Sequence, residues 1–122
     1  MKKTVLHVDD EDNILNFVNL VLTPAGYDIV SFNSVDDLYK SVDILDVKPD
    51  LIILDVMIDE VDSGVVAFNR IREQYPSIPL ILFTSLGELV LQHFTELPEM
   101  VWVLSKPAEP EQLLSIVKSR VG

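Results

Sequence analysis

The chain has 122 residues, a formal net charge of −11 and no cysteine, so one domain spanning residues 1–122 is expected, without disulfides or thiol chemistry. No apolar run approaches the roughly 20 residues of a membrane span, and the N-terminus is unlike a signal peptide, which predicts a cytoplasmic protein without membrane association. The acidic charge would repel phosphate backbones, so no direct nucleic-acid binding is expected.

Along the chain, short apolar runs alternate with amphipathic segments. The first strand, 4–8, ends in acids, and the helix after it is stopped by Pro24 and Gly26. Ser34 is a suitable N-cap for the second helix, and Lys48-Pro49-Asp50 breaks the chain before the third strand. The expected strands are 4–8, 28–32, 51–54, 80–83 and 101–104, and the expected helices are 13–22, 34–45, 64–74, 87–95 and 110–120.

This alternation predicts an α/β fold, a parallel five-stranded sheet in a doubly wound sandwich with helices on both faces. In such a sheet the binding site lies beyond the carboxyl ends of the strands, where the strand order reverses. The residues that follow the strands are therefore the candidates for function.

Those residues form a chemically coherent set, namely Asp9, Asp10 and Glu11, then Asp55, then Thr84 and Ser85, and finally Ser105, Lys106 and Pro107. Crowded carboxylates repel one another unless a cation joins them, and an all-oxygen set suits Mg²⁺ or Ca²⁺. A lysine and a hydroxyl across the pocket can neutralise the oxygens of a phosphoryl group, and a carboxylate is a competent phosphoryl acceptor.

Four segments in this order resemble the signature of the response-regulator receiver family over nearly the whole chain: Val8-Asp9-Asp10-Glu11, Leu51-Ile52-Ile53-Leu54-Asp55, Phe83-Thr84-Ser85 and Lys106-Pro107. The resemblance implies a flavodoxin-like (βα)5 fold with strand order 2-1-3-4-5. It also implies two-component signalling, a phosphorelay in which the receiver becomes a phosphoprotein.

The same resemblance assigns roles to residues. Asp55 is the phosphoacceptor, Thr84 would hydrogen-bond the phosphoryl oxygen, and Lys106 would pair with it. Mg²⁺ would be held by Asp9, Asp10, Asp55 and the backbone carbonyl of Met57. The Lys106–Pro107 peptide bond is expected to be cis.

The implied phosphodonor is a sensor histidine kinase or a histidine phosphotransfer protein. Phosphorylation would then alter a surface made by the fourth helix, the fifth strand and the fifth helix. An output domain or downstream protein would read that surface, and a homodimer could form through it. Weak autophosphatase activity and self-phosphorylation from small phosphodonors are expected, rather than turnover of a diffusible substrate.

Three departures from the family pattern concern signal transmission. The loop from Met57 to Gly64 lacks the usual proline, Val103 replaces the usual aromatic switch residue, and residues 97–100 replace the usual Gly-Ala. Trp102, beside Val103, should point to the opposite face of the strand. These departures leave open a pseudo-receiver that signals without phosphate.

Simpler interpretations exist for single residues. The acids after the first strand could favour a helix N-terminus, Thr84 could be an N-cap, and Lys106 could be a solvated charge. His7 and His93 are expected to be structural rather than catalytic. A magnesium-dependent phosphatase is disfavoured because Met57 stands where such enzymes often carry a second acid.

Overall fold

The computed structural model describes residues 2–34, 48–55, 61–85 and 100–121, in which five strands form one parallel sheet with order β2-β1-β3-β4-β5. The strands are β1 (Thr4–Val8), β2 (Asp28–Phe32), β3 (Leu51–Leu54), β4 (Leu80–Thr84) and β5 (Val101–Ser105). The helices are α1 (Asp12–Leu22), α3 (Val61–Gln74) and α5 (Pro110–Val121). The expected strand order and doubly wound arrangement are confirmed.

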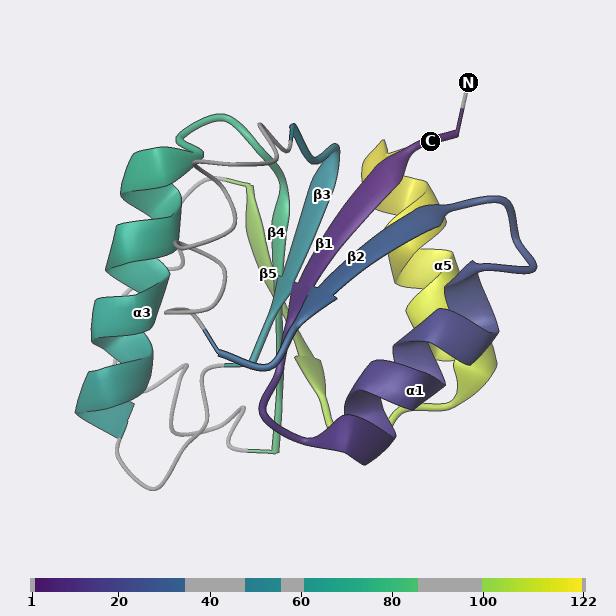
Figure 1. The fold of residues 1–122 in the computed structure, drawn as a ribbon, viewed down its shortest axis with the longest axis horizontal. Coiled ribbons are helices and arrows are strands. Elements are labelled where there is room, and N and C mark those ends of the chain that lie inside the picture. Colours follow the sequence, from purple (N-terminus) through teal and green to yellow (C-terminus); the bar gives the residue numbers. More distant parts are fainter. Residues whose placement is uncertain (1, 35–47, 56–60, 86–99, 122) are drawn as a thin grey trace.

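The helices cover both faces of the sheet, with α3 on one face and α1 and α5 on the other (Figure 1). The expected second and fourth helices, 34–45 and 87–95, lie almost wholly outside the described residues. The third helix begins at Val61 rather than at Gly64, so that expected boundary was wrong. A glycine inside a helix costs only about 1 kcal/mol, which does not prevent a helix from including it.

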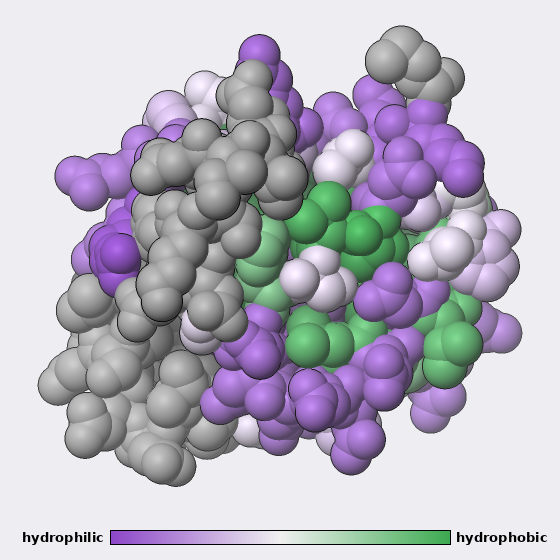
Figure 2. Space-filling model, viewed as in Figure 1, coloured by the Kyte–Doolittle hydropathy of each residue, from purple (hydrophilic) through white to green (hydrophobic). Residues whose placement is uncertain are grey.

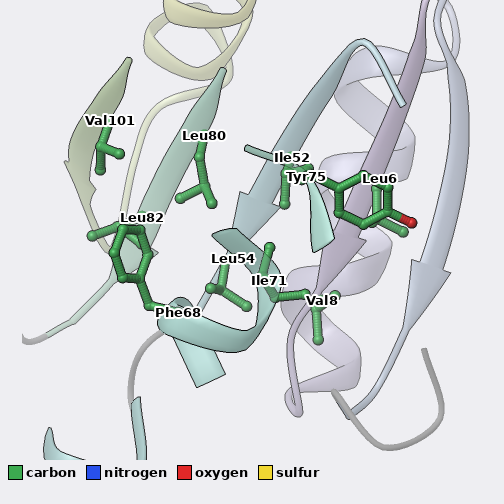
Figure 3. Packing of buried hydrophobic residues seen from close by; sticks show 10 residues of the cluster. All are labelled: Leu6, Val8, Ile52, Leu54, Phe68, Ile71, Tyr75, Leu80, Leu82 and Val101. Atoms are coloured by element: carbon green, nitrogen blue, oxygen red, sulfur yellow. The ribbon is translucent and has the colours of Figure 1, made fainter. Parts of the chain in front are cut away.

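Two apolar clusters pack against the sheet because side chains alternate between its faces. Between the sheet and α3, Phe68, Ile71 and Tyr75 meet strand residues such as Leu54 and Leu82 (Figure 3). On the other face, Val18 of α1 and Val117 of α5 pack with strand residues, which are Val5, Leu51, Ile53, Ile81 and Phe83. The strands between the helix layers are therefore rigid supports for the residues that follow them.

The edge strand β2 is less buried than the central strands β1 and β3. Figure 2 shows apolar side chains gathered over β2 and α1 on the face in view, with polar residues around them. Helix α1 ends before Gly26, whose φ of 99° is the left-handed conformation that glycine adopts without strain. In the described part of the chain, none of the helices has the length and apolar character needed to cross a membrane.

Arg72, near the C-terminus of α3, connects three segments at the end of the sheet opposite the carboxyl ends of the strands. Its Nη1 donates to the carbonyls of Tyr75 at 3.0 Å and Ile78 at 2.7 Å, and its Nη2 to that of Met100 at 3.4 Å. Met100 has a φ of 63°, which is unusual for a residue with a side chain. The guanidinium thus donates to the carbonyls of Tyr75 and Ile78 and is a second donor to that of Met100, which also accepts the backbone N–H of Leu80 at 3.0 Å.

Candidate functional site

The backbone ladder fixes three of the predicted site residues just beyond the strands. Each of them comes directly after a strand, and its amide continues the hydrogen bonding with the neighbouring strand. Asp9 donates to the carbonyl of Phe32 at 3.1 Å, Asp55 to that of Val8 at 3.0 Å, and Lys106 to that of Thr84 at 2.9 Å. A backbone hydrogen bond to the neighbouring strand thus fixes the position of the main chain at each of these residues.

The side chain of Lys106 joins the acids at this edge. Its Nζ lies 2.8 Å from Oδ2 of Asp9, 3.0 Å from Oε2 of Glu11 and 3.3 Å from Oδ2 of Asp55. Only 8% of the lysine side chain is exposed, against 0% for Asp9, 4% for Asp55 and 58% for Glu11. A single ammonium thus contacts two buried carboxylates and one solvated carboxylate.

Both carboxylate oxygens of Asp9 are engaged. Oδ1 accepts the backbone N–H of Glu11 at 2.9 Å, and Oδ2 accepts a hydrogen bond from Lys106. The first contact turns the chain so that the side chain of Glu11 faces Lys106. Asp9 is therefore a fixed acceptor, whereas Glu11 is the exposed member of the set.

Burial and neighbouring charges have opposite effects on the pKa values of Asp9 and Lys106. Burial raises the pKa of Asp9, and the hydrogen bond from Lys106 opposes this without cancelling it. For Lys106, burial is the largest single effect and lowers the pKa. The hydrogen bond with Asp9, the charge of Asp55 and the hydrogen bond with Glu11 together outweigh it, so that the pKa of Lys106 is raised. The ammonium form of Lys106 is the stable form in this pocket.

His7 lies directly below Asp9 on β1 and is completely buried. Burial, and secondly the positive charge of Lys106, lower its pKa to about 3, so the imidazole is neutral near pH 7. Its Nε2 is 3.9 Å from Oδ2 of Asp9, too far for a hydrogen bond. Within the described residues, neither ring nitrogen has a hydrogen-bond partner.

The structure brings together Asp9, Asp55 and Lys106 from the predicted set, with Thr84 fully buried at the end of β4. Asp10 is exposed and is absent from the group of converging carboxylates. Met57 and His93 lie outside the described residues. The Lys106–Pro107 peptide bond is cis, as expected.

Glu11 is the residue that the sequence placed at this edge without giving it a role. Ligand oxygens of Asp9, Glu11 and Asp55 lie within 4.8 Å of one another. Three carboxylate oxygens at that spacing fit a hard divalent cation, which prefers oxygen ligands. The signal for Glu11 was its position two residues after Asp9, where a carboxylate can accept the backbone N–H and turn the chain.

On β5, Trp102 and Val103 point to opposite faces of the sheet, as predicted. Val103 packs against the cluster on the α3 side. Trp102 faces α5, where the guanidinium carbon of Arg120 lies 4.0 Å from the centre of the indole ring. The substitution of the usual aromatic residue therefore leaves an aliphatic side chain on the α3 side of this strand.

Comparison with known proteins agrees with this geometry. The chain is 33% identical over 88 residues to the alkaline phosphatase synthesis transcriptional regulatory protein PhoP of Bacillus subtilis, covering 72% of this chain and 35% of that protein. It is 32% identical over 119 residues to the DNA-binding dual master transcriptional regulator RpaA of Synechocystis sp. The match covers 94% of this chain and 47% of RpaA. The chain thus spans less than half the length of these two relatives.

Among solved structures, the BeF3-activated DrrB receiver domain is 31% identical, with a TM-score of 0.76 and coverage of 98% of this chain and 97% of that one. The family model described as the response regulator receiver domain matches residues 5–118. That range contains all the strands except the first residue of β1, together with the buried acids and the lysine that joins them. By its sequence, its sheet and this edge, the chain belongs to the response regulator receiver domains of two-component systems.

Proposed function

We propose that Asp55 accepts a phosphoryl group from a phosphohistidine on a sensor histidine kinase or a histidine phosphotransfer protein. The observation that carries this proposal is the ammonium of Lys106, held 3.3 Å from the buried carboxylate of Asp55 at the carboxyl end of the sheet. A buried carboxylate with a cation at that distance is placed to become an acyl phosphate.

In the transfer, an oxygen of Asp55 forms a bond to phosphorus while the bond from phosphorus to the donor's imidazole nitrogen breaks. The imidazole leaves with the electron pair of that bond and takes a proton from solvent. Lys106 would neutralise negative charge on the phosphoryl oxygens, and Thr84 would donate its hydroxyl hydrogen to one of them. Because the side chain of Asp55 is buried, its carboxylate is poorly hydrated. Little water must therefore be displaced before a carboxylate oxygen can attack the phosphorus atom.

The residues present fit Mg²⁺, because oxygens of Asp9, Glu11 and Asp55 converge and one ammonium leaves them with excess negative charge. Asp9, Asp10, Asp55 and the carbonyl of Met57 are the proposed ligands, and Glu11 is a further candidate. Mg²⁺ held by these residues would supply positive charge in addition to that of Lys106.

We further propose that Lys106 and Thr84 shift toward the phosphoryl group and alter the surface around β5, α5 and the expected fourth helix. An output domain or a downstream protein would read this surface, and a homodimer could form through it. A transcriptional output is in keeping with the printed names of PhoP and RpaA. No general base for water is evident among the described residues near Asp55, which favours a phosphoryl lifetime of minutes or longer and only weak autophosphatase activity.

The second candidate is a pseudo-receiver, and Val103 is the observation that favours it. An aromatic rotamer change coupled to Thr84 cannot occur at an aliphatic side chain. Such a module would bind its partner in the same way with and without phosphodonor.

Intact mass after incubation with acetyl phosphate, with and without Mg²⁺, separates the two candidates. One added phosphoryl group is expected for the wild type in the presence of Mg²⁺, and none for D55N. D50N is a matched control, because Asp50 accepts the backbone N–H of Thr4 at 2.9 Å away from the site, and D50N should be labelled. An unlabelled, folded wild type would support the pseudo-receiver.

A further inference from the structure

Among the residues that the structure describes, His7 is the one buried polar side chain near the site that the proposed chemistry leaves without a role. Along β1, Val5, His7 and Asp9 share a face of the sheet, since alternate residues of a strand point the same way. Val5, and Ile53 opposite His7 on β3, belong to the cluster beneath α1 and α5. The imidazole is therefore surrounded mainly by apolar side chains, with the carboxylate of Asp9 at its upper end.

A buried ring N–H without an acceptor is unfavourable by about 1–3 kcal/mol. An apolar residue at this position would avoid that penalty, so burial alone does not account for a histidine here. Nε2 of His7 lies 3.9 Å from Oδ2 of Asp9. That same oxygen accepts the 2.8 Å hydrogen bond from Lys106.

The two donors compete for one acceptor. While Lys106 holds Oδ2, the imidazole remains about 1 Å beyond hydrogen-bond distance. If Lys106 turns to a phosphoryl group on Asp55, Oδ2 of the buried Asp9 side chain loses the hydrogen bond from Lys106. A small movement of either side chain then brings Nε2–H within reach of Oδ2.

We propose that His7 is a positioning residue that donates an Nε2–H hydrogen bond to Asp9 when Lys106 leaves Asp9 for the phosphoryl group. This inference rests on the proposed function, because the departure of Lys106 is part of it. The hydrogen bond keeps the carboxylate of Asp9 in its orientation while Asp55 is phosphorylated. The neutral form of His7 suffices, which agrees with its lowered pKa.

Imidazole nitrogen and proton NMR on the uniformly ¹⁵N-labelled protein tests this, because it observes both the ring of His7 and the backbone amide of Lys106. With Mg²⁺ alone, the Nε2–H of His7 should show no hydrogen-bond shift. With Mg²⁺ and beryllofluoride it should move downfield and exchange more slowly with solvent. Unchanged His7 resonances, while the amide of Lys106 responds to beryllofluoride, would overturn the role of His7 and leave the proposed function standing.

Two variants of His7 with side chains of similar length, one with an N–H donor and one without, test the effect on the rate of phosphorylation. H7Q keeps an N–H donor near the position of Nε2, whereas H7M has similar length and no donor. The initial rate of labelling by acetyl phosphate should fall about tenfold in H7M, the factor expected when a hydrogen bond to a buried charge is lost. H7Q should restore it to within about twofold of wild type. Equal rates in the two variants would contradict the proposal.

A third protein separates this inference from the phosphoryl chemistry. In K106M the competing ammonium is absent, so the Nε2–H of His7 should show the downfield shift without any phosphodonor. If the wild type is never labelled but K106M shows the shift, the proposed function fails while the contact between His7 and Asp9 stands. No shift in K106M would overturn the contact itself.

Discussion

Lowering the pH from about 7.5 to about 5 is expected to reduce the free energy of unfolding by about 2 kcal/mol through His7 alone. The pKa of His7 is about 3 in the folded protein, against an ordinary value near 6.5 in the unfolded chain. Between these values the unfolded chain binds a proton that the folded protein does not, so stability falls as the pH falls. Each pH unit below about 6.5 contributes roughly 1.4 kcal/mol.

The replacement H7Q removes this contribution, so the difference in stability between the wild type and H7Q should change by about 2 kcal/mol over that pH range. Asp9 acts in the opposite direction, because burial raises its pKa, but it is present in both proteins. Working at about pH 5 also keeps the protein above its isoelectric point of about 4.3.

Urea unfolding followed by the fluorescence of Trp102 and by circular dichroism measures the effect. At a typical slope of about 2 kcal/mol per molar urea, the midpoint difference between the two proteins should move by roughly 1 M. I53V, at the position opposite His7 on β3, is the control, and its deficit should not depend on pH. If H7Q and the wild type lose stability in parallel, burial does not hold His7 in its neutral form.

Three further perturbations test other contacts. K106M should lower the free energy of unfolding by about 3 kcal/mol, because it leaves Asp9 buried without its cation. Mg²⁺ at about 100 times its dissociation constant should restore up to about 2.7 kcal/mol of this loss. Unfolding midpoints that stay unchanged in both conditions would contradict the ion pair. R72M should lower the free energy of unfolding by about 2 kcal/mol, because three carbonyls lose the donor that Arg72 supplies. Acetyl phosphate should still phosphorylate R72M at the wild-type rate, and slower phosphorylation would show that α3 is coupled to the site. R120Q should lower stability by about 0.5–1 kcal/mol and alter the fluorescence of Trp102, whereas an unchanged spectrum would refute that contact.

The sheet and the edge that carries the site could be predicted from the sequence because both follow from simple periodicity. Buried runs such as Leu51–Leu54 have no other interpretation in a chain of this length, and each is followed by a polar residue. The strand order came from the family resemblance rather than from periodicity. Parallel strands with right-handed crossovers then place Asp9, Asp55 and Lys106 at one edge, which the structure confirms.

The contacts of the individual acids could not be predicted in the same way. Whether Asp10 or Glu11 faces Lys106 depends on the turn made by Asp9, a matter of one hydrogen bond. The start of α3 depends on a small difference in helix propensity around Gly64. The isolation of His7 depends on side-chain directions in three dimensions, so the pattern of β1 predicts its burial but not its missing partner.

The strands that carry the site differ in how they are held, which divides the site into a fixed and an adjustable part. Asp9 and Asp55 follow β1 and β3, each of which is paired on both sides, whereas Lys106 follows β5, which is paired only with β4. Lys106 reaches Asp9 across the sheet through four methylene groups. For protein engineering, this means that the outer surface of β5 and α5 can be rebuilt toward new partners while the acceptor stays as it is.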